Sequence, residues 1–233
     1  MHHGSVESAR PRHLLTRTGV AAGALLAALV CAAPASARII EVGATESEAT
    51  PTCPSSPCLA VSRTTGYQAK VVDSRAAYVV PRNGRIVAWT ISLGTPDERQ
   101  VEFFEDNYGE ASAQLTILRR GKRLYHRVIA QSPVQELQPY FGQSVQFPLE
   151  RSIPVKRGQV VALTVPTWAP ALSQLLDDGS SWRASRARDK CNDTDSQTAQ
   201  TRRGQLTQYR CLYRARLTYS ATLITDPRPN QPR

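Results

Sequence analysis

The stretch YRCLYRARLTYSATL, residues 209–223, carries the clearest structural pattern in this chain of 233 residues. Every second residue from Tyr209 to Leu223 is apolar or aromatic, and the residues between them are mostly polar. Successive side chains of a strand point to opposite faces of a sheet, so this alternation predicts a strand with one buried face. Because the stretch is longer than a usual strand, we expect a bend or a bulge within it.

Three stretches upstream also predict strands. GRIVAWTISLG (84–94) is a nearly continuous apolar run between glycines, which is typical of a central strand buried on both faces. AQLTILRRGKRLYHRVIAQ (113–131) and IPVKRGQVVALTV (153–165) each contain strand-like sequence around a short, polar, glycine-containing turn. These two stretches predict hairpins.

Helical periodicity is nearly absent, and only APALSQLLDD (169–178) could form a helical turn or two. Many short strands separated by turn residues predict an all-β fold over residues 59–224. The expected architecture is an antiparallel β-sandwich of jelly-roll type with little helix. The immunoglobulin pattern does not fit, because Trp89 does not lie between cysteines at the required spacing.

The first 37 residues predict a signal peptide. Three arginines precede an apolar segment, residues 19–33, and the triplet ASA at 35–37 has the small-x-small pattern of a cleavage site. The apolar segment is too short for a comfortable membrane span. We therefore expect general secretory export, cleavage after Ala37, and a secreted or extracytoplasmic protein.

The mature chain would consist of a polar leader (38–58), the predicted sandwich domain (59–224) and a Pro-rich tail (225–233) that we expect to be disordered. No later segment is apolar enough to span a membrane. The mature chain carries 26 basic and 18 acidic residues, and this excess favours anionic partners.

Four cysteines remain after cleavage, at Cys53, Cys58, Cys191 and Cys211. An even number of cysteines behind an export signal predicts disulfide bonds. Pairing by proximity gives Cys53–Cys58, a short loop in the leader, and Cys191–Cys211, while two other connectivities are possible. A four-cysteine zinc site is disfavoured, because the spacing within each pair is too wide.

Only one histidine, His126, lies outside the predicted signal. A single histidine excludes two-histidine zinc and iron sites. His126 alternates with Leu124 and Val128, so we expect a partly buried histidine on a strand. No G-x-S-x-G nucleophile motif, P-loop or dinucleotide fingerprint occurs. We therefore expect no cofactor and no histidine-based catalysis.

Six carboxylates crowd the stretch PDERQVEFFEDNYGE (96–110) in an otherwise basic chain. We interpret this stretch as a loop that is solvated or paired with arginines. A calcium site is one alternative, with Asp106, Asn107 and Glu110 as oxygen ligands around Gly109. A pair of these carboxylates could instead serve a glycoside hydrolase, which needs two of them across a sugar.

Two tryptophans could bind a sugar. Trp168 follows Pro166, which has no amide proton to donate and should end the preceding strand after Val165. We favour a buried Trp168 that caps the core over an exposed platform that stacks on a sugar ring. Trp182 is the second candidate for stacking.

The turn of the first predicted hairpin is strongly basic and contains Arg119, Arg120, Lys122 and Arg123. A solvated turn is the simplest interpretation, and binding of an anionic polymer is the functional one. Nucleic acid is disfavoured as a partner, because the protein is exported and the turn lacks interleaved aromatic residues.

GRIVAWTISLG, VVALTVPTWAPAL (160–172) and YRCLYRARLTYSATL together resemble a group of uncharacterised exported β-sandwich proteins of high-GC Gram-positive bacteria. The resemblance covers most of residues 59–224. It implies export to a bacterial envelope and carries over no functional residue, because no activity is assigned to the group.

These observations lead us to expect a secreted, non-enzymatic β-sandwich protein with a binding or structural role at the cell envelope. Its expected partner is an envelope polysaccharide or an anionic polymer, and its oligomeric state is left open. The alternative is a carbohydrate-active hydrolase that uses paired carboxylates from residues 96–110.

Overall fold

The computed structural model describes residues 37–45, 49–53, 55, 58–174, 179–193 and 197–227, together with Met1. The predicted signal peptide lies outside the described residues apart from its first and last residues, and so does the predicted tail from residue 228 onward. Among the described residues, no helix combines the length and the apolar character needed to cross a membrane.

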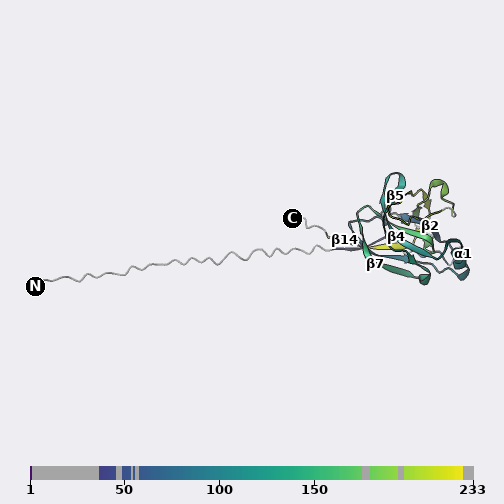
Figure 1. Ribbon diagram of the computed structural model, residues 1–233, viewed down its shortest axis with the longest axis horizontal. Helices are drawn as coiled ribbons and strands as arrows, with labels where there is room; N and C mark the ends of the chain where they lie inside the picture. The colour runs from purple at the N-terminus through teal and green to yellow at the C-terminus, as the bar shows by residue number, and fades with distance from the viewer. Residues whose placement is uncertain are drawn as a thin grey trace. The chain divides into compact units, whose positions relative to one another are not determined.

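The described part of the chain is mostly β, with one α-helix, α1 (Glu98–Tyr108), at one end of the strands (Figure 1). Three short 3-10 helices are η1 (Lys122–Leu124), η2 (Gln138–Tyr140) and η3 (Arg188–Lys190). The strands are β1 (Ile39–Val42), β2 (Val61–Lys70), β3 (Gly84–Ser92), β4 (Ser112–Arg120), β5 (Tyr125–Gln131), β6 (Gln135–Glu136), β7 (Ser144–Val155), β8 (Val160–Ala169), β9 (Leu172–Ser173), β10 (Ser181–Ala184), β11 (Leu206–Gln208), β12 (Cys211–Tyr213), β13 (Arg216–Leu217) and β14 (Tyr219–Thr225).

The strands form antiparallel sheets. We call the sheet with the strand order β1-β14-β3-β7 sheet A, and the sheet with the order β11-β5-β4-β8-β2-β10-β12 sheet B. Strand β6 pairs with β4 beside this path, and β13 and β9 form a small third sheet. The prediction of a β-rich antiparallel fold is confirmed.

Sheets A and B share one hydrophobic core. Trp89 and Ile91 of β3 belong to the same buried cluster as Leu115 of β4 and Leu163 of β8. Trp89 is fully buried and packs on Phe147 of the neighbouring strand β7, with ring centroids 5.0 Å apart. Burial of large aromatic and aliphatic side chains from both sheets is the main source of cohesion between them.

Sheet B is curled until its two edge strands almost meet. Strand β11 lies on one edge beside β5, and β12 lies on the other edge beside β10. Only Tyr209 and Arg210 separate β11 from β12, so Gln208 and Cys211 are at most about 10 Å apart. In a flat sheet, the strand spacings between these edges would add up to about 29 Å. The sheet must therefore bend around on itself and enclose a small interior.

Ring contacts identify the inner face of the curled sheet. The rings of Tyr67 on β2 and His126 on β5 lie 4.9 Å apart between centroids, although β8 and β4 stand between their strands. Tyr209 packs against both rings, at 5.4 Å from Tyr67 and 4.9 Å from His126. We call the buried set around these rings the inner cluster; its apolar and aromatic members are Tyr67, Leu118, Val128, Val160, Ala162 and Tyr209.

A row of threonine hydroxyls crosses the same inner face. The hydroxyl of Thr164 on β8 is 2.9 Å from that of Thr65 on β2 and 2.6 Å from that of Thr116 on β4. Gln131 donates to Thr116 at 3.0 Å, and the backbone amide of Gln200 donates to Thr65 at 2.9 Å. Buried hydroxyls without partners would destabilise the fold, so this network explains how a polar row is tolerated inside the sheet.

The stretch at 209–223 is interrupted as expected, and each of its pieces joins a different sheet. Strand β12 belongs to sheet B, β13 to the small sheet and β14 to sheet A. All the predicted inward positions are buried except Tyr213, which is half-buried. The alternation therefore predicted which residues face inward, and the chain uses the interruptions to pass from sheet B to sheet A.

Two strand predictions need correction. The hairpin predicted at 113–131 is present as β4 and β5, but the turn within 153–165 joins β7 of sheet A to β8 of sheet B. Residues 153–165 therefore connect the two sheets and form no hairpin. Strand β3 is central in sheet A but is buried on one face only, because Arg85 is exposed and Thr90 is half-buried on the other face.

Helix α1 was not predicted, and the interpretation of residues 96–110 as a loop is wrong. Asp97 caps the helix by accepting from the amide of Gln100, whose side chain accepts in turn from the amide of Asp97, both at 2.9 Å. This reciprocal capping box stabilises a helix start.

The prediction that residues 169–178 could form a helical turn is also wrong for the residues that the structure describes, because Leu172 and Ser173 form β9. Residues 175–178 lie outside the described part.

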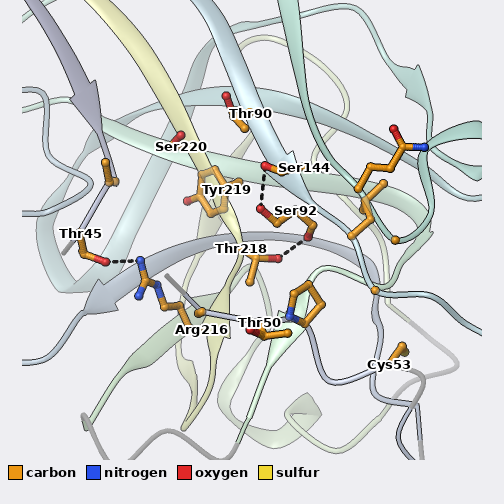
Figure 2. Close-up of a pocket in the computed structure, with 18 of the residues that line it drawn as sticks. Thr45, Thr50, Cys53, Thr90, Ser92, Ser144, Arg216, Thr218, Tyr219 and Ser220 are labelled. Atoms are coloured by element: carbon orange, nitrogen blue, oxygen red, sulfur yellow. Dashed lines mark hydrogen bonds between the residues drawn. The ribbon is translucent and has the colours of Figure 1, made fainter. Parts of the chain in front are cut away.

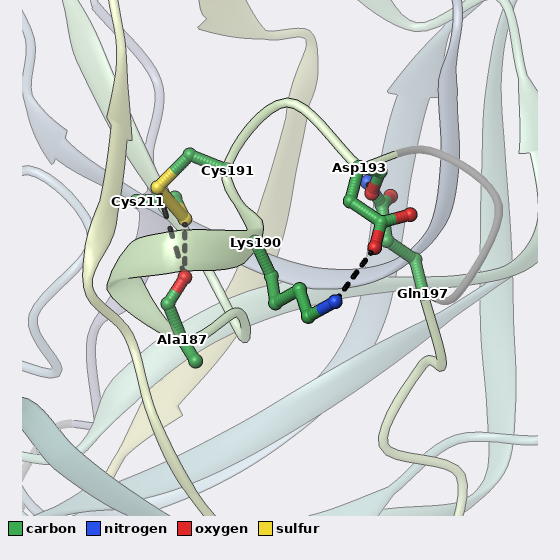
Figure 3. Close-up of polar contacts among 6 residues, drawn as sticks. All are labelled: Ala187, Lys190, Cys191, Asp193, Gln197 and Cys211. Atoms are coloured by element: carbon green, nitrogen blue, oxygen red, sulfur yellow. Dashed lines mark hydrogen bonds and ion pairs between the residues drawn. A yellow bond between two sulfur atoms is a disulfide. The ribbon is translucent and has the colours of Figure 1, made fainter.

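Both disulfides that were expected by proximity are present, Cys53–Cys58 and Cys191–Cys211. The second bond ties the segment that contains η3 to the edge strand β12 (Figure 3). The same segment carries an ion pair in which the Lys190 ammonium lies 3.2 Å from a carboxylate oxygen of Asp193. The disulfide holds β12 near the chain that follows its partner strand β10.

Candidate functional site

Trp168 is a core residue. Its side chain is fully buried and stacks on Phe104 of helix α1, with ring centroids 4.6 Å apart. Phe141 packs against it from a second side at 5.5 Å. The preferred prediction of a buried tryptophan is confirmed, and the alternative of a sugar platform is wrong because no face of the ring reaches solvent.

Strand β8 continues through Pro166, so the predicted end after Val165 is wrong. In the register with β2, Thr64 pairs with Val165 and Ser62 pairs with Trp168. The register shifts between these pairs, at Arg63, which has a positive φ of 41°. A bulge of this kind interrupts the ladder, and Pro166 is tolerated there because no amide donor is required of it.

Trp182 on β10 is also unavailable for sugar stacking. It is 4 % exposed, and its ring centroid lies 4.8 Å from that of Tyr213 on the paired strand β12. The indole ring also packs closely on Gly66, where an added Cβ would lie 2.7 Å from the ring. The prediction of Trp182 as a ligand-binding residue is therefore wrong.

The proposed calcium ligands do not form a calcium loop. Asp106 and Asn107 lie in the last turn of α1, and Glu110 follows the helix. The side chain of Asn107 donates to the carbonyl of Phe103 at 2.7 Å, and Arg63 donates to the carbonyl of Asn107 at 2.6 Å. Within the described ranges, no group of three or more His, Cys, Asp and Glu side chains could hold a metal ion.

The predicted basic turn lies at the tip of the β4–β5 hairpin, and Arg119, Arg120, Lys122 and Arg123 are all exposed. Strand β11 extends this surface. Arg119 pairs directly with Arg127, which in turn pairs with Leu206. The turn before β11 is tied to the hairpin by a hydrogen bond from Arg127 to the carbonyl of Gly204, at 2.8 Å.

We call the set of cations formed by these two segments the basic surface; it comprises the exposed residues Arg119, Arg120, Lys122, Arg123, Arg202 and Arg203 and the half-buried Arg127. No acidic residue occurs in 111–135 or 197–225, the two stretches that supply it. The ion pairs that join two described residues are Lys70–Asp73 and Lys190–Asp193, and neither involves the basic surface. No described carboxylate therefore forms an ion pair with the basic surface.

His126 is buried inside the curled sheet, as expected for a strand histidine. Its Nδ1 donates to the carbonyl of Leu124 at 2.9 Å, and its Nε2 is buried without a hydrogen-bond partner among the described residues. Burial lowers the pKa of His126 below its ordinary value, and the charges of Arg120 and Arg183 act in the same direction. The imidazole is therefore neutral at neutral pH.

A polar pocket of about 570 Å³ lies beside sheet A (Figure 2). Its lining is rich in hydroxyls, several of which are already bonded: Ser92 donates to Ser144 at 3.0 Å, and Thr218 donates to the carbonyl of Ser92 at 2.6 Å. Glu41 is the only carboxylate among its described lining residues, and it accepts from Ser220 at 2.6 Å. The pocket can form hydrogen bonds but has no pair of carboxylates for hydrolysis.

Comparison of the chain with protein-family models, with curated proteins and with solved structures gave no match.

Burial of Trp168 predicts a large loss of stability on truncation. We expect Trp168→Ala to lower the free energy of unfolding by about 3–5 kcal/mol, because it leaves a cavity between helix α1 and the core. The matched control is Phe103→Ala on the same helix, where the ring is 57 % exposed and the expected change is within about 0.5 kcal/mol. Urea unfolding at neutral pH measures both values. A Trp168→Ala protein as stable as the control would contradict the packing described here.

The lowered pKa of His126 predicts a loss of stability in mild acid. Because the unfolded chain binds a proton at a higher pH than the folded protein does, the free energy of unfolding should fall as the pH drops from about 7 to about 5. His126→Phe keeps a ring in the inner cluster and removes this titration, so its stability should fall less over this window than that of the unaltered protein. Equal slopes for the two proteins would show that His126 does not titrate differently on folding.

Proposed function

We propose that this protein is exported to the cell envelope and binds an anionic envelope polymer through its basic surface, without catalysing a reaction. We also propose that sheets A and B together form a β-sandwich of jelly-roll type, which presents the β4–β5 hairpin as its binding element. The expected ligand groups are the repeated phosphates or carboxylates of a wall polymer or an acidic polysaccharide.

The observation that carries the proposal is the unbalanced charge of the basic surface. Arg119 and Arg127 stand directly opposite each other on paired strands, and like charges in this arrangement destabilise a sheet. No carboxylate in the two contributing stretches relieves the repulsion. A bound polyanion would relieve it, so the surface fits a partner with closely spaced negative charges.

The side-chain chemistry supports the same class of ligand. All but one of the residues of the basic surface are arginines, whose planar guanidinium groups match the geometry of phosphate and carboxylate. Several such contacts along one polymer would act together, and each would release counterions on binding. The affinity should therefore be strongly dependent on salt and only weakly dependent on the neutral parts of the polymer.

No observation favours the hydrolase alternative. Glu102 and Glu105, which could have formed a carboxylate pair, lie on helix α1 and not among the residues that line the polar pocket. The described lining of that pocket contains a single carboxylate, Glu41, whereas glycoside hydrolysis uses two.

The proposal predicts that removal of charge from the hairpin tip weakens polymer binding. The test variant carries three substitutions together, Arg119→Gln, Lys122→Gln and Arg123→Gln. Its binding to soluble poly(glycerol phosphate) is measured by titration at several salt concentrations. Each phosphate contact that is lost should reduce the slope of log affinity against log salt by about one.

The matched control carries Arg38→Gln, Arg99→Gln and Arg151→Gln, which remove the same charge at exposed positions outside the basic surface. It should change the affinity much less than the tip variant. Equal effects of the two triple variants, equally tight binding of neutral dextran, or release of sugar from a polysaccharide would contradict the proposal.

A further inference from the structure

Two arginines extend from the inner face of the curled sheet. Arg120 at the end of β4 pairs directly with His126 on β5, and Arg183 on β10 pairs directly with Tyr67 on β2. Directly paired residues of antiparallel strands point to the same face of the sheet. Because Tyr67 and His126 belong to the interior, both guanidinium groups lie on the inner side, where the curled sheet opens to solvent.

The curl brings these two arginines over the same group of rings. The centroids of Tyr67 and His126 are 4.9 Å apart, which links the strand that pairs with Arg183 to the strand that pairs with Arg120. The charges of both arginines also act on both rings: they oppose the rise that burial causes in the pKa of Tyr67, and they add to the fall in the pKa of His126. Both cations therefore lie near enough to the ring cluster to act on the same two rings.

Arg183 is held in place without a carboxylate. Its Nη1 donates to the carbonyl of Tyr209 at 3.2 Å and to that of Arg210 at 3.3 Å, the two residues that bridge β11 and β12. These neutral partners fix the guanidinium but leave its charge unbalanced. The backbone of Arg120 is paired with that of His126, but its side chain forms no hydrogen bond or ion pair with the described residues. Both groups keep donors available for a ligand.

A third polar group in this cluster also lacks a partner. Nε2 of His126 is buried, in a residue that is only 3 % exposed, and has no hydrogen-bond partner among the described residues. A buried polar atom without a partner is costly, and such atoms require a specific explanation. The imidazole has its proton on Nδ1 in the neutral state, so Nε2 gains a proton to donate when the ring becomes charged.

We propose that Arg120 and Arg183 form an oxyanion subsite at the mouth of the curled sheet, above the rings of Tyr67, His126 and Tyr209. The subsite takes one phosphate or carboxylate group between the two guanidinium forks. That this group belongs to a polymer rests on the proposed function, whereas the subsite itself can be tested with free ions. Of the basic surface, Arg120 alone belongs to the subsite; the other residues contact further groups along the polymer.

The test uses the ring resonances of His126, which is the only histidine outside the predicted signal. Inorganic phosphate and acetate are titrated separately into the protein at constant ionic strength, with chloride as the balancing anion. We expect a saturable shift of the His126 resonances. Tighter binding of phosphate would assign the subsite to a phosphate-bearing polymer, and tighter binding of acetate to an acidic polysaccharide, and either result supports the subsite.

Arg120→Gln should weaken the binding of the ion by about tenfold or more, because a charged hydrogen-bond donor is lost. Arg183→Gln should have the same effect. If the loss of the hydrogen bonds from Arg183 to Tyr209 and Arg210 prevents folding, the binding measured for Arg120→Gln alone tests the subsite. The matched control is Arg210→Gln, an exposed arginine next to Tyr209 that should change binding by less than about twofold.

Three results would overturn the subsite: no shift of His126 with either ion, a shift that does not saturate, or an equal loss in Arg210→Gln and Arg120→Gln. Polymer binding without any response of His126 to the free ions would overturn the subsite and leave the proposed function standing. A response of His126 to the ions without polymer binding would overturn the proposed function and leave the subsite standing. If neither the ions nor the polymer bind, the subsite and the proposed function are both overturned.

Discussion

The link of two residues between β11 and β12 is the constraint on which the rest of sheet B depends. These strands sit on opposite edges of one sheet, so Tyr209 and Arg210 can join them only if the sheet bends around on itself. Once the sheet is bent, the rings of Tyr67, His126 and Tyr209 meet inside it. The same bend is what brings Arg120 and Arg183 toward each other from strands that a flat sheet would keep well apart.

The burial of the aromatic residues limits which side chains are exposed and available to bind a ligand. Trp168 and Trp182, the candidates for sugar stacking, are both used in the core, where large rings contribute most to stability. The carboxylates of residues 96–110 are spread along helix α1. The exposed arginines of the β4–β5 hairpin lie outside the core, and no described carboxylate forms an ion pair with them.

The sequence predicted the inward residues better than the arrangement of the strands. Alternation at 209–223 identified the buried side chains, but a period of two is the same in sheet A and sheet B, so it could not show that β12 and β14 belong to different sheets. Helix α1 could have been found from the capping box of Asp97 and Gln100, a signal that the density of carboxylates hid. The basic turn was predicted correctly as exposed. Its relation to Arg183 was not predictable, because it depends on the curl and not on any local pattern.

A nuclear Overhauser measurement on His126 tests directly whether sheet B is curled around one ring cluster. Its ring protons can be assigned without ambiguity in a protein that lacks residues 1–37, because the rest of the chain has no other histidine. Cross-peaks are expected from His126 to the ring protons of Tyr209, which follows the neighbouring strand β11, and to those of Tyr67, whose strand β2 is separated from β5 by β4 and β8. Cross-peaks from His126 only to residues of β4, β5 and β11, with none to Tyr67, would contradict the curled arrangement.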